Sequence, residues 1–154
     1  MLIMGCTSLR STPVALSPEA EASRAEASSI PTVHLESSGS SVQGLESVSL
    51  WTDANRMGGG GEAPLANPPT FPGVLDLQAG QSIEIVVIAN SLVSPLIVTE
   101  LNMVGVPMVS SVLKPMTSAT PYSPIAVGHF VLQVTVQQSW QQYVTYLFEV
   151  NAIP

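Results

Sequence analysis

The segment from Val74 to Pro154 combines strand-forming sequence with very little charge. Its 81 residues include five charged side chains: Asp76, Glu84, Glu100, Lys114 and Glu149. Charged residues make up about a quarter of an ordinary soluble domain, so much of this segment's exterior lacks the groups that keep a free monomer in solution. Either uncharged polar residues such as its glutamines face the water, or another protein or a membrane assembly covers part of the surface. We expect the second.

The charge of the whole chain argues against one class of partner. The 154 residues carry a formal net charge of −7, and the four basic residues are scattered: Arg10, Arg24, Arg56 and Lys114. Nucleic-acid binding depends on clustered basic side chains that neutralise phosphates. The sequence has no such cluster, so we exclude nucleic acid as a partner.

Cys6 is the only cysteine, which excludes a disulfide within the chain and a metal site of several cysteines. It ends the string Leu2-Ile3-Met4-Gly5-Cys6. This string resembles the lipobox of bacterial lipoproteins, in which apolar residues and a small residue precede the lipidated cysteine. The resemblance implies that residues 1–6 are the remnant of a signal sequence and that Cys6 anchors an extracytoplasmic protein to a membrane. A chance cysteine near a disordered end is the alternative.

Residues 7–44 are rich in Ser, Ala, Glu and Pro and hold few large apolar side chains. Such a stretch cannot bury enough surface to offset the entropy lost on ordering. We therefore predict a flexible tether over 7–44 and a folded domain over 45–154. No run of the sequence approaches the roughly 20 apolar residues of a membrane-spanning helix.

The folded domain is expected to open with a short alternating segment and a long loop. Residues 45–51 alternate apolar and polar side chains, which predicts a strand or an adhesive peptide. Residues 52–73 hold four consecutive glycines, starting at Gly58, and four prolines. A phosphate-binding loop needs a helix beginning with Lys, Ser or Thr, whereas Glu62-Ala63-Pro64 follows here. We predict a flexible loop, long enough to suggest contact with a partner.

The strands of residues 74–154 follow from alternation and from turn residues. Residues 82–89 are apolar on both faces, as in a central strand or one whose outer face is covered. In residues 130–137, Leu132, Val134 and Val136 share one face, while the opposite face carries Gln133, Thr135 and Gln137. Further strands are predicted at 74–77, 95–103, 108–113 and 143–150.

The segments between these strands are predicted to be turns and loops. Turns are expected at 78–81 and 104–107, and a hairpin is expected at 139–142. The three prolines of residues 114–124 predict a loop or an edge strand. Because no amphipathic helix competes, we predict an all-β fold, a small antiparallel β-sandwich or barrel.

The order of features from Leu77 to Val134 is similar to that of a known family. A long apolar strand follows Leu77-Gln78-Ala79-Gly80-Gln81 and ends at Asn90-Ser91; Leu113-Lys114-Pro115 and then Val127-Gly128-His129-Phe130 come later. This order resembles a cupredoxin domain, particularly the extramembrane domain of cytochrome oxidase subunit II. Immunoglobulin-like domains share such strand patterns and are the alternative.

The copper ligands of that family do not carry over. Ser94-Pro95 stands where the family places its first histidine, and residues 130–140 contain neither cysteine nor histidine. Copper sites of this kind need thiolate and imidazole ligands together. The resemblance therefore implies a scaffold without metal or other cofactor.

Other candidate sites are weaker. His34 falls in the predicted tether, and His129 is expected at the rim or in the core. Met103, Met108 and Met116 suggest a thioether site for Cu(I), although methionine commonly fills gaps in a core. Glu84 and Glu100 are expected to be solvated strand residues. No Ser-His-acid set can be placed, so we predict no catalytic site, no enzyme activity and no small-molecule substrate.

Four aromatic residues are interface candidates because aromatic side chains dominate the energetics of protein contacts. They are Trp51, Phe71, Trp140 and Tyr143. A core position is the alternative for Trp51, whereas Trp140 is expected at a hairpin tip.

These observations predict a lipid-anchored, extracytoplasmic accessory subunit, on the periplasmic side or at the cell surface, that packs against the protein subunits of a membrane complex. The resemblance to the oxidase subunit implies a complex of electron transfer or photosynthesis. A secreted or surface-displayed adhesion or filament module is the second hypothesis. A periplasmic copper carrier that uses methionines is the third.

Overall fold

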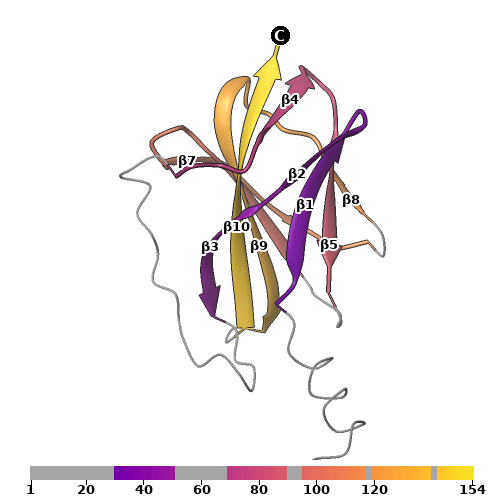
Figure 1. The fold of residues 1–154 in the computed structure, drawn as a ribbon, viewed down its shortest axis with the longest axis vertical. Coiled ribbons are helices and arrows are strands. Elements are labelled where there is room, and N and C mark those ends of the chain that lie inside the picture. Colours follow the sequence, from indigo (N-terminus) through magenta and orange to yellow (C-terminus); the bar gives the residue numbers. More distant parts are fainter. Residues whose placement is uncertain (1–29, 51–68, 90–94, 117–118, 140–141) are drawn as a thin grey trace, which may run out of the picture.

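The computed structural model describes residues 30–50, 69–89, 95–116, 119–139 and 142–154. These residues form ten strands arranged in two sheets that pack face to face (Figure 1). The prediction of a small β-sandwich is therefore confirmed. Within the described ranges, no helix is long and apolar enough to span a membrane.

The ten strands are short at the start of the chain and long at its end. Their bounds are β1 Thr32–Ser37, β2 Ser40–Gln43, β3 Leu45–Leu50, β4 Val74–Gln78, β5 Ile83–Ile88, β6 Leu96–Leu101, β7 Pro107–Leu113, β8 Thr120–Tyr122, β9 Gly128–Ser139 and β10 Gln142–Ile153.

One sheet has the order β2-β1-β5-β8, with antiparallel neighbours throughout. Strands β1 and β2 are joined by Ser38 and Gly39, whose φ angles are 49° and 83°. Two consecutive residues with positive φ match the right-handed twist of the flanking strands, which is why such turns join tight hairpins. Gly39 adopts this conformation without the steric cost of a Cβ atom.

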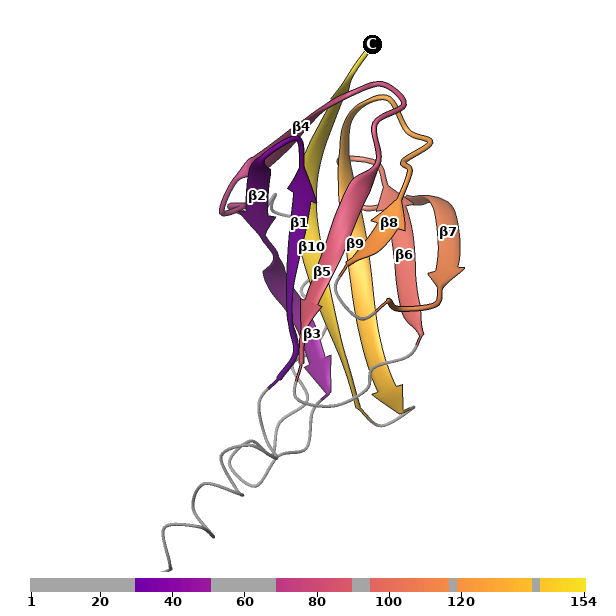
Figure 2. The ribbon, with the colours of Figure 1, turned by 90° about the vertical axis from the view of Figure 1, so that its right-hand side faces the viewer.

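The other sheet has the order β3-β10-β9-β6-β7 and gains a sixth strand, β4, beside β10. Strand β3 runs antiparallel to β10 over Tyr143–Leu147, whereas β4 runs parallel to it over Glu149–Ile153. The two short strands therefore share one edge of β10. Figure 2 shows β6 and β7 at the opposite side of this sheet.

The core lies between the sheets and follows the predicted alternation. Leu132, Val134 and Val136 of β9 point inward and are fully buried, while Gln133 and Thr135 face outward and are half-buried. Strand β10 contributes the inward side chains Val144, Tyr146, Phe148 and Val150. The strand predictions at 130–137 and 143–150 are confirmed.

The turns and the remaining strands also lie near their predicted positions. Gln81 N donates to Gln78 O at 3.0 Å in the predicted turn at 78–81, where Gly80 has a φ of 84°. Gly105 N donates to Asn102 O at 2.9 Å between β6 and β7. For residues 114–124 the sequence predicted a loop or an edge strand. Part of this segment, Thr120–Tyr122, forms the short edge strand β8.

The predicted boundary between tether and domain at residue 44 is wrong. Val33 and Leu35 of β1 are fully buried, and Tyr146 Oη donates to Pro31 O at 2.8 Å. Residues 30–44 therefore belong to the sandwich. Two apolar side chains in a Ser-rich stretch give a weak local signal, and β1 gains its stability from pairing along β5. Residues 45–50 form strand β3. This agrees with the first of the two alternatives predicted for residues 45–51, a strand or an adhesive peptide.

Candidate functional site

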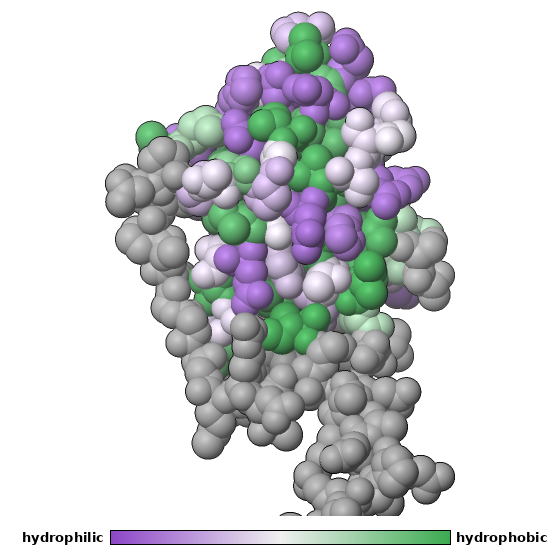
Figure 3. Space-filling model, in the orientation of Figure 1, coloured by the Kyte–Doolittle hydropathy of each residue, from purple (hydrophilic) through white to green (hydrophobic). Residues whose placement is uncertain are grey.

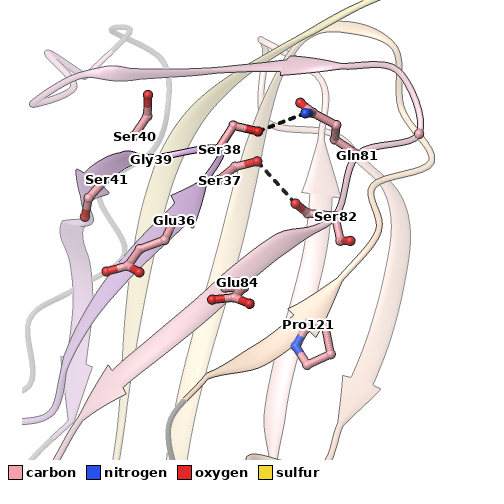
Figure 4. Close-up of a pocket in the computed structure, with 11 residues that line it drawn as sticks. Glu36, Ser37, Ser38, Gly39, Ser40, Ser41, Gln81, Ser82, Glu84 and Pro121 are labelled. Atoms are coloured by element: carbon pink, nitrogen blue, oxygen red, sulfur yellow. Dashed lines mark hydrogen bonds between the residues drawn. The ribbon is translucent and has the colours of Figure 1, made fainter.

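A polar concavity lies over one end of the four-stranded sheet, between the β1–β2 hairpin and the β4–β5 turn (Figure 4). Its volume is about 710 Å³. Serine side chains and two carboxylates dominate its lining: Ser37, Ser38, Ser40, Ser41, Ser82, Glu36 and Glu84.

Two hydrogen bonds join the hairpin and the turn at the border of this concavity. Gln81 Nε2 donates to Ser38 Oγ at 2.9 Å, and Ser37 Oγ donates to Ser82 O at 3.2 Å. Gln81 Oε1 also accepts from Gln78 N at 2.8 Å, within its own turn. Gln81 therefore fixes the hairpin and the turn relative to each other.

Glu36 of β1 and Glu84 of β5 lie directly opposite each other at the floor of the concavity. Both are exposed. Like charges in directly opposed positions destabilise a sheet, so the pair lowers stability slightly. The described residues hold no group of three or more His, Cys, Asp or Glu side chains that could bind a metal. The described residues that line the concavity provide hydroxyls and carboxylates but no imidazole to pair with them.

Glu100 is not a solvated strand residue, as the sequence predicted, but is fully buried. Its carboxylate accepts hydrogen bonds from Tyr122 Oη at 2.6 Å, Ile125 N at 2.8 Å and Ala126 N at 2.7 Å. Glu100 follows Leu96 and Val98 at intervals of two, so the alternation itself placed it inward. A carboxylate in this position is tolerated because three donors replace the water it loses. Glu84, by contrast, is exposed as predicted.

The Glu100 carboxylate fixes the segment after β8 against β6. Desolvation, together with the hydrogen bond and the charge of Glu100, raises the pKa of Tyr122 above its ordinary value, and a hydrogen bond with Ser111 opposes this. The fixed segment presents Ile125 and Val127 to solvent, with exposed fractions of 70% and 62%. Both border a small cavity of about 80 Å³.

The outer face of the six-stranded sheet carries rows of uncharged side chains across β3, β10, β9 and β6. Opposed residues in a sheet point to the same side, so the register groups them into three rows: Ile97-Thr135-Thr145-Val48, Thr99-Gln133-Leu147-Leu45 and Gln137-Tyr143-Leu50. We call these eleven positions the uncharged face; Thr99, Thr145 and Leu147 are buried, and the other eight are half-buried. The hydroxyls of Thr135 and Thr145 lie 2.9 Å apart, as do those of Thr99 and Ser110 on β7.

At one end of this outer face, the side chain of Phe71 covers the sheet. Charged side chains of the sheet lie further along the strands, past Phe71. Phe71 packs on Leu101, Val131 and Leu147, which form a second buried cluster. Further along the sheet, His129 Nδ1 lies 3.6 Å from Glu149 Oε1, and Asn151 Nδ2 donates to Asp76 Oδ1 at 2.9 Å.

The predicted site residues are dispersed. Tyr143 lies half-buried on the uncharged face, and Phe71 is half-buried over the second cluster. Cys6, Trp51 and Trp140 lie outside the described residues. His34 is on β1 rather than in a tether. The His129 side chain is 57% exposed, which places it at the rim.

The three methionines do not converge. Met103 is exposed in the turn between β6 and β7, Met108 is exposed at the second residue of β7, and Met116 is exposed beyond the opposite end of β7. The length of β7, about 20 Å at roughly 3.3 Å per residue, separates them. They neither fill gaps in the core nor surround a common point.

On the side of the molecule shown in Figure 3, hydrophobic and hydrophilic residues alternate in small groups. The uncharged face is therefore defined by the strand register, which places neutral side chains in rows across four strands.

Comparison of the chain with family models, curated proteins and solved structures finds no match.

Proposed function

We propose that the protein is a non-catalytic interaction module, a lipid-anchored extracytoplasmic accessory subunit that docks a metal-free β-sandwich onto a membrane protein complex. The docking surface in this proposal is the uncharged face. The observation that carries it is the absence of any acidic or basic side chain among the eleven positions of that face.

The chemistry of the uncharged face suits a protein contact. Charged residues are depleted from the centre of interfaces, and tyrosine is enriched in interfaces; Tyr143 lies in the end row of the uncharged face, opposite Gln137 and Leu50. The hydroxyls of Thr135 and Thr145 already bond each other. Covering them removes few hydrogen bonds to water, which lowers the desolvation cost of docking.

The anchor in this proposal is Cys6, in the lipobox-like string Leu2-Ile3-Met4-Gly5-Cys6. One acyl chain holds a protein at a membrane only marginally. Protein contacts through the sandwich therefore have to contribute to retention. Mass spectrometry of the membrane-extracted chain checks for lipid on Cys6, and Cys6→Ser is expected to shift the chain to the soluble fraction.

Docking is tested by extracting membranes of the source organism in mild detergent and separating native complexes by size. The wild-type chain is expected to migrate with a larger complex. Gln133→Lys places a charge on the uncharged face and is expected to release the chain. Gln43→Lys, on exposed β2 of the other sheet, is the matched control and is expected to stay bound. A wild-type chain that migrates without any other polypeptide contradicts the proposal.

A second candidate function is a secreted or surface-displayed adhesion or filament module. The observation that favours it is the free edge of β7, which among the described strands pairs only with β6. Size-exclusion chromatography of the purified chain separates the two functions, because self-assembly needs no other polypeptide.

A further inference from the structure

Strand β7 ends the six-stranded sheet, and β6 is its only partner among the described strands. Both ribbon views place β7 at the margin of the molecule (Figures 1 and 2). The backbone groups on the free side of an edge strand are available to pair with a strand from another chain.

Residues 109–113 of strand β7 lack the protections that edge strands usually carry, whereas Pro107 and the register shift at Met108 lie at the start of the strand. Such strands are kept from pairing by charge, by proline, by bulges or by shortness. The seven residues of β7 include no charged side chain, and their one proline is the first residue, beside the register shift between Glu100 and Leu101. Met108 and Val112 are 47% and 70% exposed.

The other sheet edges in the described structure are protected. Strand β2 has four residues, and β8 has three with Pro121 at its centre. Beyond β10, the edge strands β3 and β4 carry the acidic residues Glu46 and Asp76. Among the described edge strands, β7 is therefore the longest without a charged side chain.

We propose that β7 pairs with β7 of a second copy of this chain, antiparallel about a two-fold axis through Ser110. In a continuous sheet, opposed residues point to the same face. Because every second residue of a strand shares a face, an even-numbered residue of one copy has to lie opposite an even-numbered residue of the other. The register centred on Ser110 places Met108 of each copy opposite Val112 of the other on the outer face. The two most exposed apolar side chains of the strand then cover each other.

The charges of the chain permit this pairing. Lys114 is the charged residue next to β7, and in this register it lies opposite position 106 of the second copy. The two lysines are then eight residues apart along the strands, about 27 Å at roughly 3.4 Å per residue. This exceeds the Debye length of about 8 Å at physiological ionic strength. Glu36 and Glu84 lie on the other sheet.

Sedimentation equilibrium of the full 154-residue chain tests the pairing, in reducing buffer so that Cys6 cannot link two copies. The wild-type chain is expected to form a dimer whose fraction increases with concentration. Ser110→Lys brings like charges together across the axis and is expected to raise the dissociation constant up to about fivefold. Ser110→Glu is expected to do the same.

An equimolar mixture of the Ser110→Lys and Ser110→Glu chains is expected to recover the dimer, because position 110 faces itself and the mixed pair has opposite charges. Ser41→Lys, at an exposed position of β2, is the matched control and is expected to dimerise like the wild type. A monomeric wild-type chain at all concentrations overturns the proposal. Dissociation constants that stay at the wild-type value in both separate variants, or a mixture that associates no more tightly than they do, also overturn it. The proposed docking to a membrane complex does not depend on this result, because it concerns the uncharged face.

Discussion

The phenol of Tyr122 donates a 2.6 Å hydrogen bond to the carboxylate of Glu100, 22 residues earlier in the chain. Strand β6 carries the acceptor on its inward face, and β8 of the opposite sheet carries the donor. The bond therefore joins the two layers of the sandwich inside the core.

Replacing Glu100 by Gln is expected to lower the free energy of unfolding by about 1–3 kcal/mol, because the amide turns a donor toward a group of donors. Tyr122→Phe, which removes one donor and leaves the carboxylate with two, is expected to cost less. Urea denaturation measures both. Glu84→Gln makes the same chemical change at an exposed position opposite Glu36 and is expected to be neutral or slightly stabilising. Equal effects at positions 84 and 100 would contradict the buried role of Glu100.

The stability of the protein is expected to fall at high pH in a way that depends on Tyr122. Its pKa is raised in the folded state, so above pH 10 the folded chain keeps a proton that the unfolded chain loses. The contribution is complete below about pH 10, the unfolded value, and is lost as the pH rises through the folded value. Urea midpoints between pH 8 and pH 11 check this. Tyr122→Phe should show a shallower decline; parallel curves would refute the assignment.

Gly44→Ala is expected to destabilise the protein by about 1–3 kcal/mol through overpacking. Gly44 lies where the chain passes from one sheet to the other, and a Cβ atom there would meet Phe148 Cζ at 2.6 Å and Tyr146 Cβ at 2.8 Å. Gly73→Ala is the control, because its Cβ would meet Val42 at an ordinary 3.6 Å. Thermal unfolding followed by circular dichroism compares them, and similar midpoints would show that the backbone yields at Gly44.

Leu35→Ala is expected to cost about 2–5 kcal/mol, the usual range for a fully buried leucine. Glu36→Ala, at the exposed neighbour on the same strand, should change stability little. Guanidinium denaturation distinguishes this outcome from the one expected of a flexible tether, in which neither substitution has an effect.

The strongest sequence patterns predicted the fold, and the weakest ones misplaced its beginning. In β9, alternation over a long strand fixes the inward set Leu132, Val134 and Val136, because burial on one face leaves a single register. In β1, Val33 and Leu35 alternate with polar residues over a run too short to predict a buried strand by itself. Their burial depends on β5, which is about 50 residues away in the chain, and such non-local pairing is not visible in local sequence.

The candidate sites were harder to predict than the strands. The same alternation places Glu100 inward after Leu96 and Val98, but its residue type predicted exposure, because carboxylates are seldom buried without partners. Those partners include backbone groups of Ile125 and Ala126, which no residue pattern marks. The uncharged face and the opposition of Glu36 and Glu84 likewise depend on strand order and register.

The division of one side of β10 between β3 and β4 has a consequence for how the native state opens. Each short strand holds its own half of β10, Tyr143–Leu147 or Glu149–Ile153, and the two run in opposite directions. Fraying of one leaves the amides of the other half protected from exchange with solvent. We therefore expect local opening at this margin to proceed in two separate steps of limited extent, rather than by separation of the whole of β10 at once.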